Sequence, residues 1–177
     1  KYDKTANIKK GYQFALDRYY DLDAYDRLSV PQYYMDEEAE TIELNPKGLE
    51  YLKKIVDFCR EKEIKFVLIK TPVLDKWKTS AHNAVQSVAD TYGIDFFDFN
   101  FTPLYDEIDY NFAMDSTDGL HMNYYGAQKM TSWIGNYLVT ECGVTDVRKD
   151  KDYKYLNAQV NQFHMGVTDI MRLQEIT

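Results

Sequence analysis

The stretch Ile64-Lys-Phe-Val-Leu-Ile69 decides the fold class, because it is a short apolar run rich in β-branched residues. The run Ile94-Asp-Phe-Phe-Asp-Phe99 follows it after one helix-like segment. Short runs of this kind are typical of strands buried in a parallel sheet. Strand, helix and strand with short joins form a βαβ unit with a right-handed crossover. We therefore predict parallel, neighbouring strands over 64–70 and 94–99.

Three amphipathic helices surround these strands in the sequence. The first spans about 46–62 and begins at Asn45-Pro46, a capping residue followed by proline at the first helical position. The second spans 79–92 and stops at Gly93, and the third spans about 124–141. Residues 101–117 are predicted to be a long loop. The predicted core consists of Leu52, Val56, Val67, Ile69, Val85, Val88, Phe97 and Trp133.

The two ends of the chain are predicted to be separate segments. Residues 1–44 form an irregular segment with a helix over about 6–20, and the acids at 21, 23 and 26 indicate a solvated turn rather than a calcium loop. Residues 45–145 form the α/β portion. Residues 146–177 contain a helix that packs on this portion or on a partner. Its apolar seam comprises Tyr153, Leu156, Val160, Phe163, Val167 and Ile170.

Composition limits the possible classes of function. A chain of 177 residues with 45% hydrophobic and 28% charged residues is long and apolar enough for a globular core. A net charge of −8 without a basic patch makes nucleic acid and anionic membrane surfaces poor partners. The 16 tyrosines fit either a carbohydrate-facing surface or half-buried packing. Cys59 and Cys142 form no C-x-x-C pair and are predicted to be buried free thiols.

The segment Asp118-Gly-Leu-His121 has the pattern of a compact catalytic base. Across a tight turn, the carboxylate accepts a hydrogen bond from one ring nitrogen, and the other nitrogen can take a proton from a hydroxyl. Asn123 is predicted to cap the next helix. Because both strands end at the same edge of the sheet, the catalytic pair should face a substrate cleft there. The candidates for lining this cleft are Lys70, Thr71, Asn100 and Asn123.

The continuation His121-Met-Asn123-Tyr-Tyr-Gly126-Ala127 resembles the last conserved block of the SGNH (GDSL-like) hydrolase superfamily. In that family, Asp-x-x-His supplies two members of a Ser-His-Asp triad. The resemblance covers about residues 45–140, the C-terminal half of an SGNH domain. It implies a three-layer α/β/α fold with a parallel, flavodoxin-like sheet, and a serine esterase or O-acyltransferase that needs no cofactor. It also implies an acylated cell-envelope carbohydrate or a small ester as substrate, and an extracytoplasmic bacterial setting.

The nucleophile of such a triad is not evident in this sequence. The family's serine lies in a Gly-Asp-Ser motif after the first strand, and none of the five serines here, at 29, 80, 87, 116 and 132, has that context. A two-stranded parallel sheet also cannot cover itself. We therefore expect an incomplete domain whose nucleophile comes from a missing N-terminal half or from a partner chain. Strands missed within 1–44, or a degenerate domain without the chemistry, are the alternatives. If the chain does turn over an ester, Ser116 is the first nucleophile to suspect.

Two other classes of function compete with the enzyme. An inactive SGNH-like binding module would use its tyrosines and C-terminal seam to hold a glycan or a protein. A metal hydrolase would use Asp98, Asp115, Asp118 and His121, but transition metals usually take more than one histidine. His82 and His164 lie on predicted helices without a ligand pattern around them, and we predict no metal site.

Overall fold

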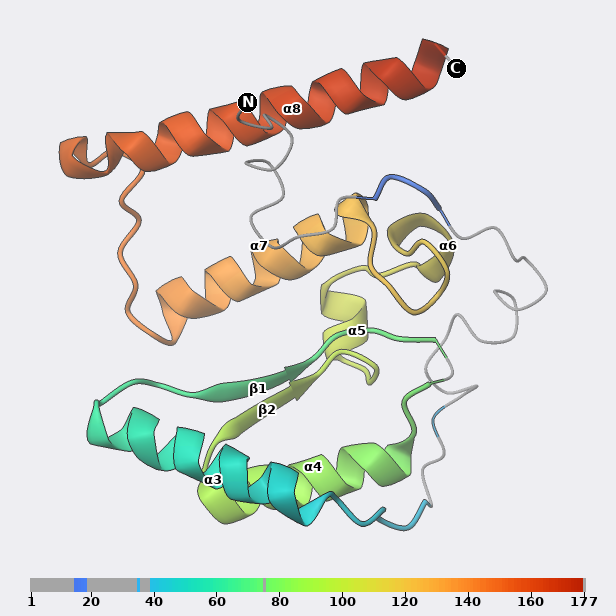
Figure 1. The fold of residues 1–177 in the computed structure, drawn as a ribbon, viewed down its shortest axis with the longest axis vertical. Coiled ribbons are helices and arrows are strands. Elements are labelled where there is room, and N and C mark those ends of the chain that lie inside the picture. The colour runs from blue at the N-terminus through green and yellow to red at the C-terminus, as the bar shows by residue number, and fades with distance from the viewer. Residues whose placement is uncertain (1–14, 19–34, 36–38, 75, 177) are drawn as a thin grey trace. The chain divides into compact units, whose positions relative to one another are not determined.

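The computed structural model describes residues 15–18, 35, 39–74 and 76–176 (Figure 1). The chain divides into two compact units, Asp17–Trp133 and a second unit that contains Ile134–Thr177, so the units are bounded differently from the three predicted segments. Most of the predicted helix over 6–20 and all of the acidic turn lie outside the described residues. Within those residues, the structure contains no helix with the length and apolar character needed to cross a membrane.

The sheet consists of strands β1 (Val67–Lys70) and β2 (Asp95–Asp98), which pair in parallel. The register runs from Val67 opposite Asp95 to Lys70 opposite Asp98. This pairing confirms the predicted parallel neighbours and a mixed α/β class. Both strands begin later than predicted. Because Val67 already faces the first residue of β2, the apolar residues before it lie beyond the end of the pairing.

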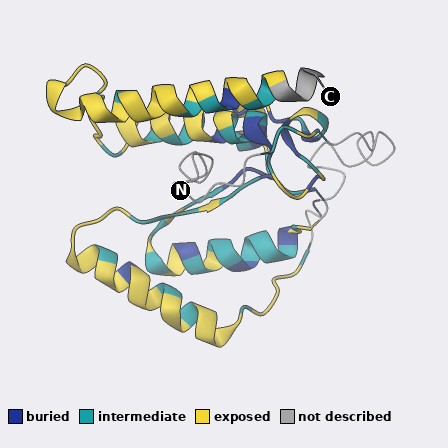
Figure 2. Ribbon diagram, turned by 45° about the horizontal axis from the view of Figure 1, so that its top comes forward, coloured by how far each residue is buried: buried dark blue, intermediate teal, exposed yellow. Residues whose placement is uncertain are grey.

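The three long helices predicted next to the strands are confirmed to within one residue: α3 (Pro46–Glu61), α4 (Thr79–Tyr92) and α7 (Tyr124–Thr140). Asn45 caps α3 by accepting hydrogen bonds from two backbone N–H groups, and Gly93 ends α4 in the left-handed conformation at φ 58°. In Figures 1 and 2, α3 and α4 lie on the same side of the two strands.

The two faces of β2 contact different helices. The Phe96 ring packs against His82 of α4 with ring centroids 5.4 Å apart, and the next residue, Phe97, packs against Trp133 of α7 at 5.1 Å. Successive side chains of a strand point to opposite faces. Both faces of β2 are therefore covered, one by α4 and the other by the first half of α7.

The segment predicted as a loop over 101–117 contributes much of the core, which corrects that prediction. It holds two one-turn helices, α5 (Leu104–Glu107) and α6 (Phe112–Asp115). Tyr105, Tyr110 and Phe112 are buried here and pack edge to face or tilted against one another, with ring centroids 5.1 to 6.1 Å apart. One turn is too short to show helical periodicity, so the sequence does not reveal these elements.

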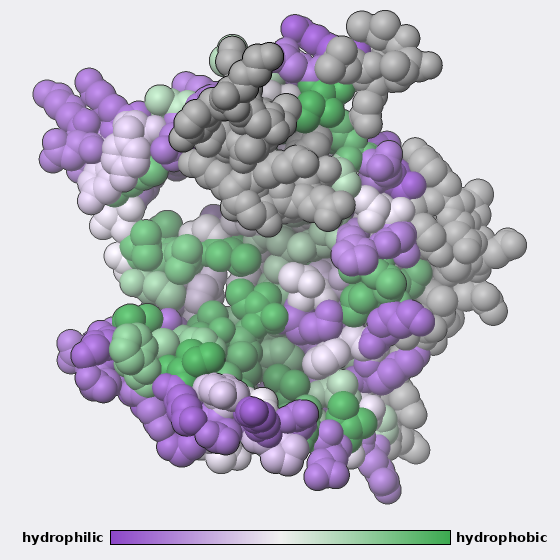
Figure 3. All heavy atoms as spheres, viewed as in Figure 1, coloured by the Kyte–Doolittle hydropathy of each residue, from purple (hydrophilic) through white to green (hydrophobic). Residues whose placement is uncertain are grey.

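The predicted core is mostly half-buried rather than buried. Val56 is buried, Ile69 is 37% exposed, and the other six predicted residues lie between these limits. Helix α3 explains part of this difference, because its apolar residues form two stripes. Tyr51, Ile55 and Phe58 point away from the core and remain about half exposed. Figure 3 shows apolar atoms gathered beside α3 and β1, as expected for a two-stranded sheet.

The second unit contains a 3₁₀ turn, η2 (Lys151–Tyr153), and the helix α8 (Lys154–Ile176), which runs without interruption through Gly166. Only the C-terminal half of the predicted seam is covered. Val167 is buried, with Phe163 and Ile170 half-buried, whereas the seam residues before them are exposed.

Truncating the aromatic core should destabilise the protein far more than truncating the exposed stripe of α3. Phe112→Ala removes a fully buried ring, and we expect a loss of about 3–5 kcal/mol in the free energy of unfolding. Ile55→Ala, at a half-exposed position, should cost less than about 1 kcal/mol. Urea unfolding of both variants measures the difference. Equal losses would mean that the aromatic cluster is not the core.

Candidate functional site

The Asp-x-x-His segment forms a tight hairpin-like turn. Ser116 and Met122 form an isolated antiparallel bridge at its base, and the Thr117 N–H donates to the carbonyl of His121 at 2.9 Å. Gly119 occupies the tip with φ 78°, a conformation that L side chains rarely adopt. The turn thus holds the two candidate catalytic residues on a short, internally bonded loop just before α7.

The Asp118 carboxylate organises this turn with both of its oxygens. Oδ1 accepts hydrogen bonds from the backbone N–H groups of Leu120 and His121 at 2.9 and 2.8 Å. Oδ2 lies 2.8 Å from Nδ1 of His121, which confirms the predicted contact. An ionised carboxylate can only accept, so Nδ1 must hold the proton and Nε2 is the basic nitrogen of the neutral ring. The pair is open to solvent, with side chains 49% and 77% exposed.

Partial burial acts to raise the pKa of Asp118. Hydrogen bonds from the His121 side chain and from the backbone N–H groups of Leu120 and His121 outweigh this effect and lower the pKa to about 2. Asp118 is therefore ionised throughout the neutral range, as a residue that stabilises an imidazolium should be.

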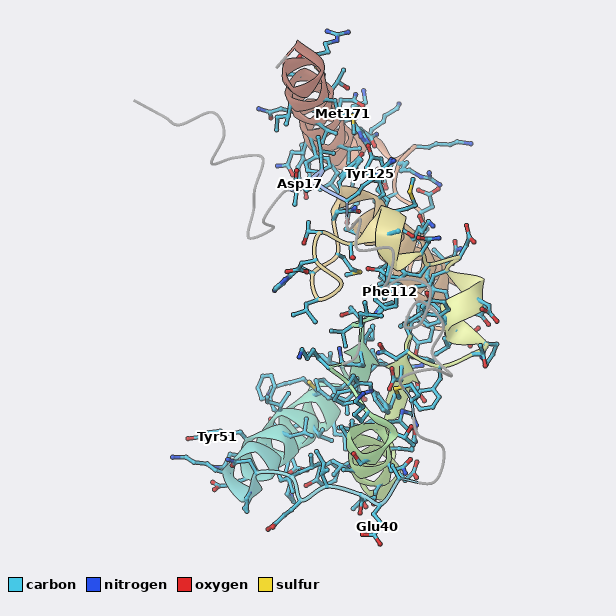
Figure 4. All side chains as sticks on the ribbon, turned by 90° about the vertical axis from the view of Figure 1, so that its right-hand side faces the viewer. Asp17, Glu40, Tyr51, Phe112, Tyr125 and Met171 are labelled. Carbon is cyan, nitrogen blue, oxygen red and sulfur yellow. The ribbon has the colours of Figure 1, made fainter. Side chains whose placement is uncertain are left out.

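Asn123 joins the turn to α7. Its Oδ1 accepts from the N–H groups of Tyr125 and Gly126, which confirms the predicted cap. Its Nδ2 donates to the carbonyls of Met114 at 2.8 Å and Asp17 at 3.1 Å, and Figure 4 shows Asp17 beside the first turn of α7. Asn123 is fully buried and so cannot line a cleft, which corrects its assignment as a substrate contact.

An ion pair between the half-buried Lys129 and the buried Asp115 anchors the segment before the turn. Asp115 is buried, and its Oδ2 accepts from Lys129 Nζ and from the Asn111 N–H, both at 2.8 Å. Lys129 also donates to the carbonyl of Asp109. A charge this deeply buried is tolerated only when it is paired and hydrogen-bonded. The pair fastens α7 to the segment that leads into the turn.

Ser116 is a structural residue in this conformation. Its hydroxyl is buried, donates to the Phe112 carbonyl at 2.6 Å and accepts from the Gly119 N–H at 2.9 Å. A nucleophilic serine would instead direct its hydroxyl to the catalytic histidine. The geometry therefore gives no support to Ser116 as the nucleophile.

The remaining cleft candidates lie where the two strands end. Lys70 is the last residue of β1, and its ammonium group donates to the Thr71 carbonyl at 3.0 Å and lies over the Trp77 ring. Burial lowers the pKa of Lys70, and attraction to Asp98 offsets part of this effect. Asn100 is fully buried and cannot form the floor of an open cleft, which corrects that assignment. The cleft lined by Lys70 and Thr71 stays a prediction.

A second Asp–His pair lies at this edge and was missed from the sequence. The Asp98 carboxylate, 2% exposed, accepts through Oδ2 from His82 Nδ1 at 2.8 Å and from Trp77 Nε1 at 2.6 Å. The sequence shows no ligand pattern around His82, whose side chain is 22% exposed. His82 and Asp98 are sixteen residues apart in the sequence, so no local motif predicts their contact. The one hint in the sequence is that Asp98 is a polar residue at the carboxyl end of a strand.

The carboxylates proposed for a metal site belong to different networks. Asp98 bonds to Trp77 and His82, and Asp115 bonds to Lys129. Among the described residues, no group of three or more His, Cys, Asp or Glu side chains is placed to hold a metal ion. Cys59 and Cys142 are free thiols, and both are half-buried.

Comparison with protein-family models, with curated proteins and with solved structures found no match to this chain.

Gly126 should be the least replaceable glycine of α7. A Cβ added there would lie 2.3 Å from the carbonyl oxygen of Asp115, whereas at Gly135 of the same helix nothing lies within 4 Å. We expect Gly126→Ala to destabilise the protein by about 1–3 kcal/mol through overpacking. Gly135→Ala should stabilise it by about 0.5–1 kcal/mol because alanine favours a helix. Thermal unfolding should therefore show a lower melting temperature for Gly126→Ala and a higher one for Gly135→Ala. An unchanged melting temperature for Gly126→Ala would contradict the close contact.

The Asp118 carboxyl should titrate with a midpoint near 2 when followed by NMR. His121→Ala should raise this midpoint, because it removes the side-chain hydrogen bond. Since the pKa in the folded protein lies below the usual 3.8, ionised Asp118 stabilises the turn fully above about pH 4. That contribution is lost as the pH falls toward 2.

Asp146 provides an internal control for this titration. Its pKa is also lowered to about 2, chiefly by a side-chain hydrogen bond from Arg148, and should not respond to His121→Ala. An Asp118 midpoint near 4 in the unchanged protein would mean that the turn does not persist in solution.

Proposed function

We propose that Asp118 and His121 form the acid–base pair of an SGNH-type serine esterase or O-acyltransferase. The observation that supports this most is the 2.8 Å contact between Asp118 Oδ2 and His121 Nδ1, in a turn that leaves the imidazole largely exposed. The three-layer α/β/α arrangement is part of the proposal. Its support is that the two faces of β2 contact α4 and α7.

In this mechanism, a nucleophilic hydroxyl transfers its proton to Nε2 of His121 while its oxygen attacks the acyl carbon of an ester. Asp118 stabilises the imidazolium that forms. When the tetrahedral intermediate collapses, the bond to the leaving alcohol breaks, and His121 returns the proton to that oxygen. Water, or the hydroxyl of an acceptor, is then deprotonated in the same way and removes the acyl group from the enzyme.

The nucleophile in this proposal comes from outside the 177-residue chain, either from an N-terminal half of the same domain or from a partner chain. Ser116 and Ser132 donate to backbone carbonyls rather than to His121, which is why the hydroxyl is sought elsewhere. The proposed substrate is an acylated cell-envelope carbohydrate or a small ester in an extracytoplasmic bacterial setting. This substrate class rests on the family resemblance.

A binding module without turnover is the second candidate. The engagement of the Ser116 hydroxyl within its own turn favours it. The two functions can be distinguished at His121. The esterase needs its Nε2 to accept a proton, whereas a binding module does not require a basic nitrogen there. Saturable binding of an acylated glycan that survives His121→Ala, without any turnover, would favour the module.

His121→Ala should abolish hydrolysis of an activated acetyl ester in a protein that contains both this chain and its nucleophile. Asp118→Asn should lower kcat by about 10⁴, the loss known for the equivalent change in a serine protease. His164→Ala is the matched control, because His164 lies exposed on α8 and should leave turnover unchanged. Full activity of the His121 variant would exclude the mechanism.

The 177-residue chain alone should show neither ester turnover nor labelling by a serine-directed phosphonate. Rapid hydrolysis that this inhibitor blocks would place the nucleophile within the chain and contradict its supply from elsewhere. Substituting the serines one at a time would then identify it, beginning with Ser116.

A further inference from the structure

The structure assigns Asp98 the role of a positioning residue, which holds the turn bearing Asp118 and His121 in place through Asn100 and the loop Thr71–Leu74. Asp98 is the last residue of β2, and its carboxylate accepts four hydrogen bonds. Trp77 and His82 donate to Oδ2, while Asn100 donates to Oδ1 from its backbone N–H at 2.9 Å and from Nδ2 at 2.8 Å. Trp77 from the loop before α4, His82 from α4 and Asn100 after β2 are thus all bonded to a single buried carboxylate.

Asn100 links the Asp98 carboxylate to the loop after β1 by hydrogen bonds. Because the Asp98 carboxylate can only accept, the Asn100 amide must turn its NH₂ group toward it. Its Oδ1 therefore faces the Val73 N–H, at 2.8 Å, and Nδ2 also donates to the Thr71 carbonyl at 3.1 Å. The charge on Asp98 selects the amide orientation that holds the loop.

The loop in turn holds the tip of the catalytic turn. The Leu74 N–H donates to the Gly119 carbonyl at 2.7 Å. The Leu74 side chain is buried and packs so closely that a Cβ on Gly119 would lie 3.1 Å from it. On its other side, the Gly119 N–H donates to the Ser116 hydroxyl. Gly119 is therefore held by Leu74 from a separate segment and by Ser116 from the base of its own turn.

This support matters because the turn has little burial of its own. The hydrogen bonds of Asp118 define the shape of the turn but not its location, and both catalytic side chains are exposed. Catalytic groups must be held within about 0.5 Å of the productive geometry by the residues around them. The meaning of this positioning for catalysis rests on the proposed function, whereas the mechanical link from Asp98 to Gly119 does not.

Asp98→Asn in the 177-residue chain tests the link. The substitution removes the charge and presents an NH₂ group to donors, so the Asn100 amide loses its fixed orientation. We expect amide hydrogen exchange of Val73 and Leu74 to become about tenfold faster. Amides of α7 should change much less, which separates this effect from general destabilisation. The ring ¹⁵N shifts of His121 should stay as in the unchanged protein, because the Asp118–His121 bond is internal to the turn.

Two further variants complete the test. Asp57→Asn is the control, because Asp57 is an exposed carboxylate on α3 and should leave all of these signals unchanged. Trp77→Phe removes one hydrogen bond to Asp98 but keeps an aromatic ring, and should give a smaller effect in the same direction. It replaces Asp98→Asn if that variant does not fold. Unchanged exchange at Val73 and Leu74 in a folded variant would overturn the link.

Where the protein with its nucleophile turns over an ester, Asp98→Asn should lower kcat between about tenfold and a hundredfold with little change in KM, as for a displaced catalytic group. If Asp98→Asn speeds amide hydrogen exchange at Val73 and Leu74 but leaves kcat unchanged, the positioning role would be overturned. Absence of turnover in the unsubstituted protein would count against the proposed function alone, because the exchange experiment still decides the link.

Discussion

The need to hydrogen-bond buried polar side chains shapes the whole region around the candidate site. Asp98, Asn100, Asp115 and Asn123 are all buried, and each makes several hydrogen bonds. A buried polar group left without a partner costs about 1–3 kcal/mol, and a charged one costs more. The loops at the carboxyl ends of the strands therefore adopt the conformations that supply these partners, and the Asp-x-x-His turn is built on them.

Different residues of this region provide structural support and the exposed candidate catalytic groups. The residues beneath the turn are buried and bonded, while Asp118 and His121 face water. Water screens an exposed pair, so its hydrogen bonds alone would not hold it in one place. The hydrogen bond from the Leu74 N–H to the Gly119 carbonyl ties the turn to the loop after β1, and the Ser116 hydroxyl supports Gly119 from within the turn. Such an arrangement suits a pair whose reaction partner approaches from outside, as the proposed function requires.

The small size of the sheet explains why several apolar residues remain exposed. Two strands of four residues offer little surface for helices to cover, so Tyr51, Ile55 and Phe58 of α3 remain about half exposed. The aromatic residues between Phe99 and Phe112 supply a compact core instead. Buried tyrosines at 105, 110 and 124 show that packing accounts for part of the tyrosine excess.

The sequence by itself determined the local structure: the parallel strands, the limits of three helices and the contact between Asp118 and His121. The helix limits and the Asp118–His121 contact depend on residues close together in the chain, such as a cap at Asn45 or a stop at Gly93. The parallel pairing follows from the short helical crossover that joins the two strands. Only the tertiary structure decided that Asn100 and Asn123 are buried, that Ser116 bonds within its own turn, and that His82 meets Asp98. These contacts join segments through space or depend on burial, and burial is set by the packing of the whole unit rather than by neighbouring residues.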